Sequence, residues 1–146
     1  MSQGVSTFRL YLLRIVYLFN FVGLGLLVWP GIINHRGPWD PLHGVAFSFW
    51  AALSTLAGLG IRYPLKMLPL LLLQLFYKSI WLIAVAFPLW RAGQPTSLTR
   101  VFVIPLVIDL IAIPWPYVLA TYVRMRGDRW TSAALPASDA PALHQG

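Results

Sequence analysis

The chain has 146 residues, of which 58% are hydrophobic and only 10% are charged. Its mean hydropathy of +0.70 excludes a soluble globular protein, whose surface needs far more polar side chains. Eleven Lys and Arg residues oppose four acidic residues, all of them Asp, and the resulting net charge of +7 lies beside long apolar segments. That placement favours anionic lipid headgroups over nucleic acid as the partner. The chain has no cysteine, which excludes disulfides, thiolate nucleophiles and iron–sulfur clusters.

Four apolar segments are long enough to cross a membrane, since about 30 Å of hydrocarbon requires roughly 20 helical residues. They cover residues 15–33, 41–61, 67–90 and 101–123. Short connections rich in Pro, Gly and Arg separate them, which predicts antiparallel neighbours. The sequence therefore predicts an all-α integral membrane protein, an up-down bundle of four transmembrane helices in a single domain over residues 1–130. Residues 131–146 are small, polar and proline-containing, and we expect a disordered cytoplasmic tail.

The basic residues are distributed unevenly between the two sides of such a bundle. One side carries seven of them, in both terminal regions and the second connection: Arg9, Arg14, Arg62, Lys66, Arg124, Arg126 and Arg129. The other side carries only Arg36, Arg91 and Arg100. Because cytoplasmic loops carry an excess of Lys and Arg, we expect both termini in the cytoplasm.

Two of the expected helices have an unusual composition. The second contains many small residues, such as Gly44, Ser48 and Gly60, so that other helices can approach it closely. It is either an oligomer-forming helix or one that packs within the bundle. The fourth contains Pro105, which predicts a kink, and a Pro-Trp-Pro sequence at 114–116, which predicts a distorted or partly broken helix. Carbonyl groups freed there must be paired with protein or water.

Lys78 and Asp109 are the only Lys, Arg, Asp or Glu residues inside the expected spans. At about 1.5 Å per residue, Asp109 lies about 13 Å from Arg100 and Lys78 about 20 Å from Arg91, so their depths differ by about one helical turn. An unpaired charge near the bilayer centre costs at least about 2.5–3.5 kcal/mol, so the arrangement of lowest free energy is one in which the two charges pair with each other. The sequence predicts a contact between Lys78 and Asp109.

Other polar and aromatic side chains are expected around this pair. Gln74 and Trp81 lie on the same helix face as Lys78, and Tyr77 is its neighbour in sequence. Asn20, together with Ser54 or Thr55, is expected to complete the polar interior. The site is either a structural clamp that fixes helix register or a site for a proton, an ion or a ligand.

A second polar cluster, formed by His35, Asp40 and His43, is expected in the outer connection. Two histidines and a carboxylate are able to bind zinc or copper, although their spacing matches no known metal signature. The favoured interpretation is a loop in water or among headgroups, with His43 capping a helix or titrating. We expect no metal and no cofactor.

An inner basic rim is expected at the cytoplasmic ends of the helices. Its members are Arg62, Lys66, Arg124, Arg126 and Arg129. Such residues usually anchor helices at headgroups, and a specific anionic-lipid or partner site is the alternative.

Part of the sequence resembles a family of proteins. The resemblance rests on the segment from Leu59 to Pro69, on Gln74, Lys78 and Trp81, and on the Pro-Trp-Pro-Tyr sequence at 114–117. The members of this family are small uncharacterised bacterial four-helix integral membrane proteins with no known activity, and the similarity covers about residues 10–130. The resemblance implies the same fold and a bacterial inner (plasma) membrane. In that family the position of Gln74 is often acidic, so the glutamine here weakens the case for a proton relay.

Three functions remain open at this point. The sequence favours a noncatalytic accessory or interaction subunit, acting in a homo-oligomer or a larger membrane complex, because it contains no nucleophile elbow, phosphate loop or metalloprotease motif. The first alternative is a small transporter, or a proton-coupled or lipophilic-ligand binding protein, that uses the Lys78–Asp109 region as an oligomer. The second is a membrane enzyme acting on a lipid-soluble substrate, for which candidate catalytic groups are few.

Overall fold

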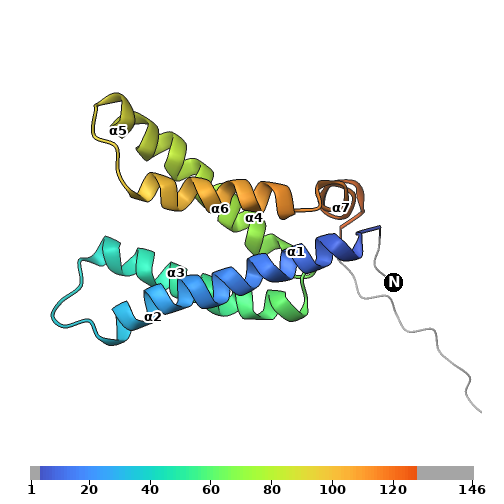
Figure 1. Cartoon of the computed structure of the whole chain (residues 1–146), viewed down its shortest axis with the longest axis horizontal. Helices are drawn as coiled ribbons and strands as arrows, with labels where there is room; N and C mark the ends of the chain where they lie inside the picture. The colour runs from blue at the N-terminus through green and yellow to red at the C-terminus, as the bar shows by residue number, and fades with distance from the viewer. Residues whose placement is uncertain (1–3, 128–146) are drawn as a thin grey trace, which may run out of the picture.

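The computed structural model describes residues 4–127, and all regular structure within that range is helical (Figure 1). Three helices in this range are long and apolar enough to cross a membrane, and a bent helix pair brings the number to four when it is counted as one span. A membrane location is therefore plausible on length and composition. The expected tail at 131–146 lies outside the described residues.

The first apolar helix is a continuous segment of 27 residues. It consists of α1 (Thr7–Leu18), a π-helical stretch η1 (Phe19–Leu24) and α2 (Gly25–Ile33). It begins earlier than the apolar sequence at residue 15, because the Ser6 hydroxyl caps it by accepting a 3.4 Å hydrogen bond from the backbone N–H of Arg9. Helical hydrogen bonding thus extends through the basic N-terminal region.

The second apolar helix, α3 (Pro41–Arg62), packs along the first helix over its length. Its start is set by Pro41 in the first turn and by the Asp40 carboxylate, which accepts a 2.9 Å hydrogen bond from the N–H of His43. The cap of this helix is therefore Asp40 and not His43, which contributes only its backbone N–H. The bounds agree with the expected span 41–61.

The third apolar helix runs from Leu68 to Arg91. It is divided into α4 (Leu68–Trp81), a π-helical stretch η2 (Leu82–Ala86) and α5 (Phe87–Arg91). In Figure 1 it runs obliquely away from the pair formed by α1–α2 and α3. α4 packs against α6 (Leu98–Ala112), which also contacts α1.

The fourth apolar segment is divided into two parts that are bent by 73°. α6 continues through Pro105, and the break lies at Ile113 and Pro114, before α7 (Trp115–Val118) and the π-helical η3 (Leu119–Arg124). Pro114 has no N–H for the carbonyl of Leu110, and the indole N–H of Trp115 donates to that carbonyl at 2.8 Å. Arg9 Nη1 donates to the carbonyl of Ile113 at 3.1 Å. Side chains therefore pair carbonyl groups at the break.

The connections between the long helices gather at two ends of the molecule (Figure 1). The connections after α2 and α5 lie at one end, and the start of α1, the turn between α3 and α4, and α7 lie at the other. The main apolar core lies toward the second end, where α1, α3, α4, α6 and α7 meet. Its buried members are Leu13, Val16, Tyr17, Ala57, Leu68, Leu71, Leu75, Ala112, Ile113 and Val118.

Candidate functional site

Lys78 and Asp109 form an ion pair between α4 and α6. Lys78 Nζ lies 3.7 Å from Asp109 Oδ2, and the two side chains are only 5% and 1% exposed. The contact predicted from their depths is present. It arises because Lys78 continues the buried stripe of α4, which contains Leu71, Gln74 and Leu75 at helical spacing. Both charges are removed from the outer surface of the protein.

The pair is held by charge and not by a direct hydrogen bond. A separation of 3.7 Å exceeds hydrogen-bond distance, and Asp109 Oδ2 accepts no hydrogen bond from any group in residues 4–127. A buried carboxylate oxygen without a donor can still accept a hydrogen bond. The arrangement fixes α4 against α6 and leaves one oxygen able to accept a further donor.

A side-chain hydrogen bond joins the third helix to the first, one turn from the ion pair. Gln74 Nε2 donates to Asn20 Oδ1 at 2.8 Å, and Asn20 Nδ2 donates to the carbonyl of Val16 at 3.0 Å. Gln74 is 3% exposed. The Asn20–Gln74 hydrogen bond and the Lys78–Asp109 ion pair lie one turn apart on α4, and together they form a polar layer across α6, α4 and η1.

Ser54 and Thr55 do not complete this layer, contrary to expectation. The hydroxyl of Ser54 donates to the carbonyl of Ala51 at 2.9 Å, and that of Thr55 donates to the same carbonyl at 2.8 Å. Each side chain therefore pairs within its own helix, which is the usual arrangement of Ser and Thr in an apolar helix.

A cluster of aromatic rings lies mostly on the same helices as the ion pair, and Phe102 of α6 is at its centre. Its ring centroid is 4.6 Å from that of Trp81, 5.9 Å from that of Tyr77 and 6.4 Å from that of Trp50, with the rings edge to face. The Lys78 ammonium lies 6.0 Å from the centroid of Tyr77. Sequence reasoning missed Phe102 and Trp50. The position of Phe102, two helical turns before Asp109, is the signal that could have identified it.

The outer-loop cluster is separate from this layer. The rings of His35 and Trp39 are stacked with centroids 3.6 Å apart, and the His43 ring stacks on Phe47 at 5.0 Å. A cavity of about 310 Å³ opens beside them. It is lined by Gly31, His35, Trp39, Asp40, His43 and Phe47. Across residues 4–127, no three His, Cys, Asp or Glu side chains are arranged to hold a metal ion.

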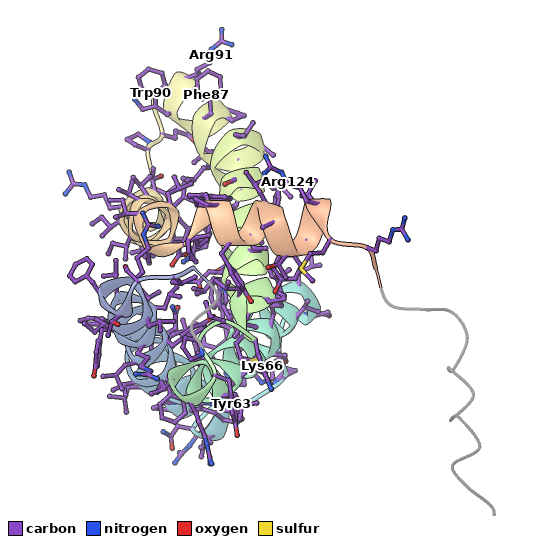
Figure 2. All side chains as sticks on the ribbon, turned by 90° about the vertical axis from the view of Figure 1, so that its right-hand side faces the viewer. Tyr63, Lys66, Phe87, Trp90, Arg91 and Arg124 are labelled. Carbon is purple, nitrogen blue, oxygen red and sulfur yellow. The ribbon has the colours of Figure 1, made fainter. Side chains whose placement is uncertain are left out.

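The inner basic rim is divided by the fold. Arg62 and Lys66 lie 5.4 and 5.7 Å from the ring centroid of Tyr63, in the turn between α3 and α4. Figure 2 shows Tyr63 and Lys66 well apart from Arg124, which belongs to η3. Arg126 follows η3 and is exposed, and Arg129 lies outside the described residues. Arg9, which binds the carbonyl of Ile113, is a further basic residue at this end.

A second cavity, of about 360 Å³, lies at the opposite end of the molecule between α5 and the start of α6. Its lining consists of Leu82, Ala86, Phe87, Trp90, Pro95, Thr96, Thr99 and Arg100. Figure 2 shows Phe87, Trp90 and Arg91 together at the far end of the third helix. Neither of these two cavities is lined by Lys78 or Asp109.

Comparison of the chain with protein-family models, with curated proteins and with solved structures gives no match. The chemistry of the site must therefore be argued from its geometry. Its charges are mutually compensated, its amide side chains bond each other, and the Tyr77 ring lies 6.0 Å from the Lys78 ammonium. Such a layer is able to hold three helices in register, and one of its carboxylate oxygens, Asp109 Oδ2, accepts no hydrogen bond within the described residues.

Proposed function

We propose that this chain is a noncatalytic integral membrane protein that acts as an accessory or interaction subunit. The observation that carries this proposal is the enclosure of Lys78 and Asp109, with 4% and 1% of their surface exposed. A pair that is sealed in this way holds helices together, whereas catalysis or transport requires access to the charged groups. The buried layer then serves the subunit by fixing its shape.

The distribution of charge supports an orientation with both termini in the cytoplasm. Six basic residues belong to the end of the molecule that contains the N-terminal region and the turn between α3 and α4: Arg9, Arg14, Arg62, Lys66, Arg124 and Arg126. Arg36, Arg91 and Arg100 belong to the opposite end. We propose four crossings of a bacterial inner membrane, with α6 and its proline-induced bend forming the fourth.

The outward face of the third helix is our candidate for the partner surface. Phe76, Ile80, Ile83 and Phe87 are 63%, 64%, 72% and 53% exposed and recur every three or four residues. Large apolar side chains at this spacing form a ridge that a neighbouring helix can pack against. The partner is a second copy of the chain or another membrane polypeptide.

Native mass spectrometry of the protein, extracted gently from its own membrane, tests the proposal. We expect a complex heavier than the single chain. A photo-crosslinking residue at Ile80 should form an adduct with the partner, whereas the same residue at Leu26, which is 71% exposed on α2, should not. A bare single chain, together with equal crosslinking from both positions, would contradict the proposal.

Binding of a proton or of a small lipophilic ligand is the second candidate function, and it is favoured by Asp109 Oδ2, which accepts no hydrogen bond within the described residues. Under this alternative, native mass spectrometry should detect a small molecule bound to the protein. The variant Lys78→Met/Asp109→Leu should fold and lose that molecule. Retention of the same molecule by the double variant would contradict the alternative.

A further inference from the structure

The last helix of the described chain lies across the direction of the others. The segment Trp115–Arg124 is bent by 73° from α6. Figure 1 shows α7 end-on, and Figure 2, seen along the long axis of Figure 1, shows the same segment side-on. A helix in this orientation gains little depth along its length if α6 crosses the membrane.

Contacts at the bend fix its position relative to the basic turn between α3 and α4. Arg9 Nη1 donates to the carbonyl of Ile113 at 3.1 Å, and a guanidinium so near the start of α1 belongs at the interface rather than in hydrocarbon. Farther along α1, Tyr17 donates to the carbonyl of Pro64 in the basic turn between α3 and α4, at 3.0 Å. At about 1.5 Å per residue, Tyr17 lies about 12 Å deeper along the helix than Arg9. The bend is therefore at least as far from the bilayer centre as that turn.

The segment has two distinct faces. Val118 is buried against the apolar core. The exposed residues Pro116, Leu119, Ala120 and Val123 form an apolar stripe, in which Leu119 is 47% and Val123 71% exposed, and Tyr122 beside them is 46% exposed. Within the described chain, no other helix covers this stripe. Arg124 and Arg126 follow it directly.

We propose that Trp115–Arg124 is an interfacial helix that lies in the plane of the membrane. Its apolar stripe is immersed at the boundary between headgroups and acyl chains, and Arg124 and Arg126 bind lipid phosphate groups. Apolar stripes with basic residues beside them are typical of helices that lie on a bilayer. This inference rests on the membrane location proposed above and adds a partner, the phospholipid headgroup layer.

The length of α6 fits this arrangement if the bilayer adapts to it. Fifteen residues span only about 22 Å, which is shorter than the roughly 30 Å of a typical hydrocarbon core. A short span is accommodated by local thinning of the bilayer and by flanking residues. An in-plane helix immersed beside α6 promotes such thinning.

The absence of cysteine from the chain allows a direct test by single-cysteine labelling. Nitroxide labels are placed at Leu119→Cys and Val123→Cys in one pair, and at Val103→Cys and Val107→Cys on the exposed side of α6 in a control pair. The full chain is reconstituted in phosphatidylcholine–phosphatidylglycerol vesicles. Depths are measured from collisions with oxygen and with a water-soluble nickel complex. Ala120→Cys replaces Leu119→Cys if the latter does not fold.

We expect depths for the 119 and 123 labels that agree within about 2 Å, since four residues inclined at 73° gain little depth. Both should be near the headgroups, while the 103 and 107 labels should differ by about 6 Å. A difference of about 6 Å between 119 and 123 would overturn the interfacial helix and leave the spanning bundle intact. Full exposure of both labels to the nickel complex would also overturn it. A control pair without a depth difference would overturn the membrane crossing itself, and the inference with it.

Discussion

Two helix contacts in this molecule are built from different side chains. Where α3 meets the first helix, aromatic rings lie against positions without a side chain: a Cβ at Gly60 would overlap the ring of Tyr17, and one at Gly58 would lie 3.0 Å from Phe21. Where α4 meets α6, the contact contains the charges of Lys78 and Asp109, 3.7 Å apart. The first contact depends on shape, and the second on the compensation of charge.

Because the two contacts differ in this way, we expect them to respond differently to substitution. Close packing of a ring on glycine tolerates no added atom, but it leaves no polar group behind when it is disturbed. A buried ion pair tolerates the loss of both charges and does not tolerate the loss of one. Substitutions at the two contacts should therefore differ in both size and pattern.

Removal of one charge should have the largest effect. Asp109→Leu or Lys78→Met leaves an uncompensated charge inside the bundle and should lower the free energy of unfolding by about 3–5 kcal/mol. The double variant should recover most of that loss, because no charge remains. Thermal unfolding in detergent measures both effects, with Lys66→Met as an exposed control. Losses that simply add in the double variant would show that the two charges do not compensate each other.

An added methyl group at the shape-dependent contact should have the next largest effect. Gly60→Ala forces the Tyr17 ring to move and should cost about 1–3 kcal/mol. Gly23→Ala is the matched control, because nothing lies within 4 Å of a Cβ at that position. It should be neutral or slightly stabilising, since alanine favours helix. Equal effects at both positions would remove the distinction drawn between the two contacts.

Loss of the indole N–H at the break should have a smaller effect. Trp115→Phe keeps an aromatic ring and leaves the carbonyl of Leu110 without its 2.8 Å donor. We expect a loss of about 1 kcal/mol, the usual value of one hydrogen bond. Trp90→Phe, at a side chain that is 66% exposed, should change the unfolding temperature much less. An unchanged stability in Trp115→Phe would mean that this bond does not support the bend.

The amide contact next to the ion pair should give the smallest effect. A double-mutant cycle with Asn20→Leu and Gln74→Leu should yield a coupling energy of about 0.6 kcal/mol, typical of hydrogen bonds between membrane helices. Ser79→Ala is the control partner for Gln74→Leu, because the Ser79 hydroxyl donates to Leu75 of its own helix. That cycle should give a coupling near zero. A coupling as large as that of the ion pair would make the amides the main polar contact.

Much of the polar layer was predictable because it depends on depth. The positions of Lys78 and Asp109 along their helices place them about one turn apart, and charge compensation then joins them. Which amides and hydroxyls complete the layer depends on how the helices are rotated about their axes. Hence Asn20 bonds Gln74 across helices, whereas Ser54 and Thr55 turn back to Ala51. The packing of Phe102 of α6 against Tyr77 and Trp81 of α4 likewise depends on this rotation, and Phe102 was missed.

By itself the sequence determined that the chain forms long apolar helices, where the connections lie, and which charges must be paired. These features follow from the composition of the chain and from the rise of a helix per residue. Composition and rise do not depend on which helices pack together. Only the tertiary structure decided that α6 continues through Pro105 and that the chain bends by 73° after Ala112. Proline removes a donor at each of these positions. Only the chain after Ala112 bends, and there the indole N–H of Trp115 donates to the carbonyl of Leu110 that Pro114 frees, while Arg9 donates to the carbonyl of Ile113 beside it.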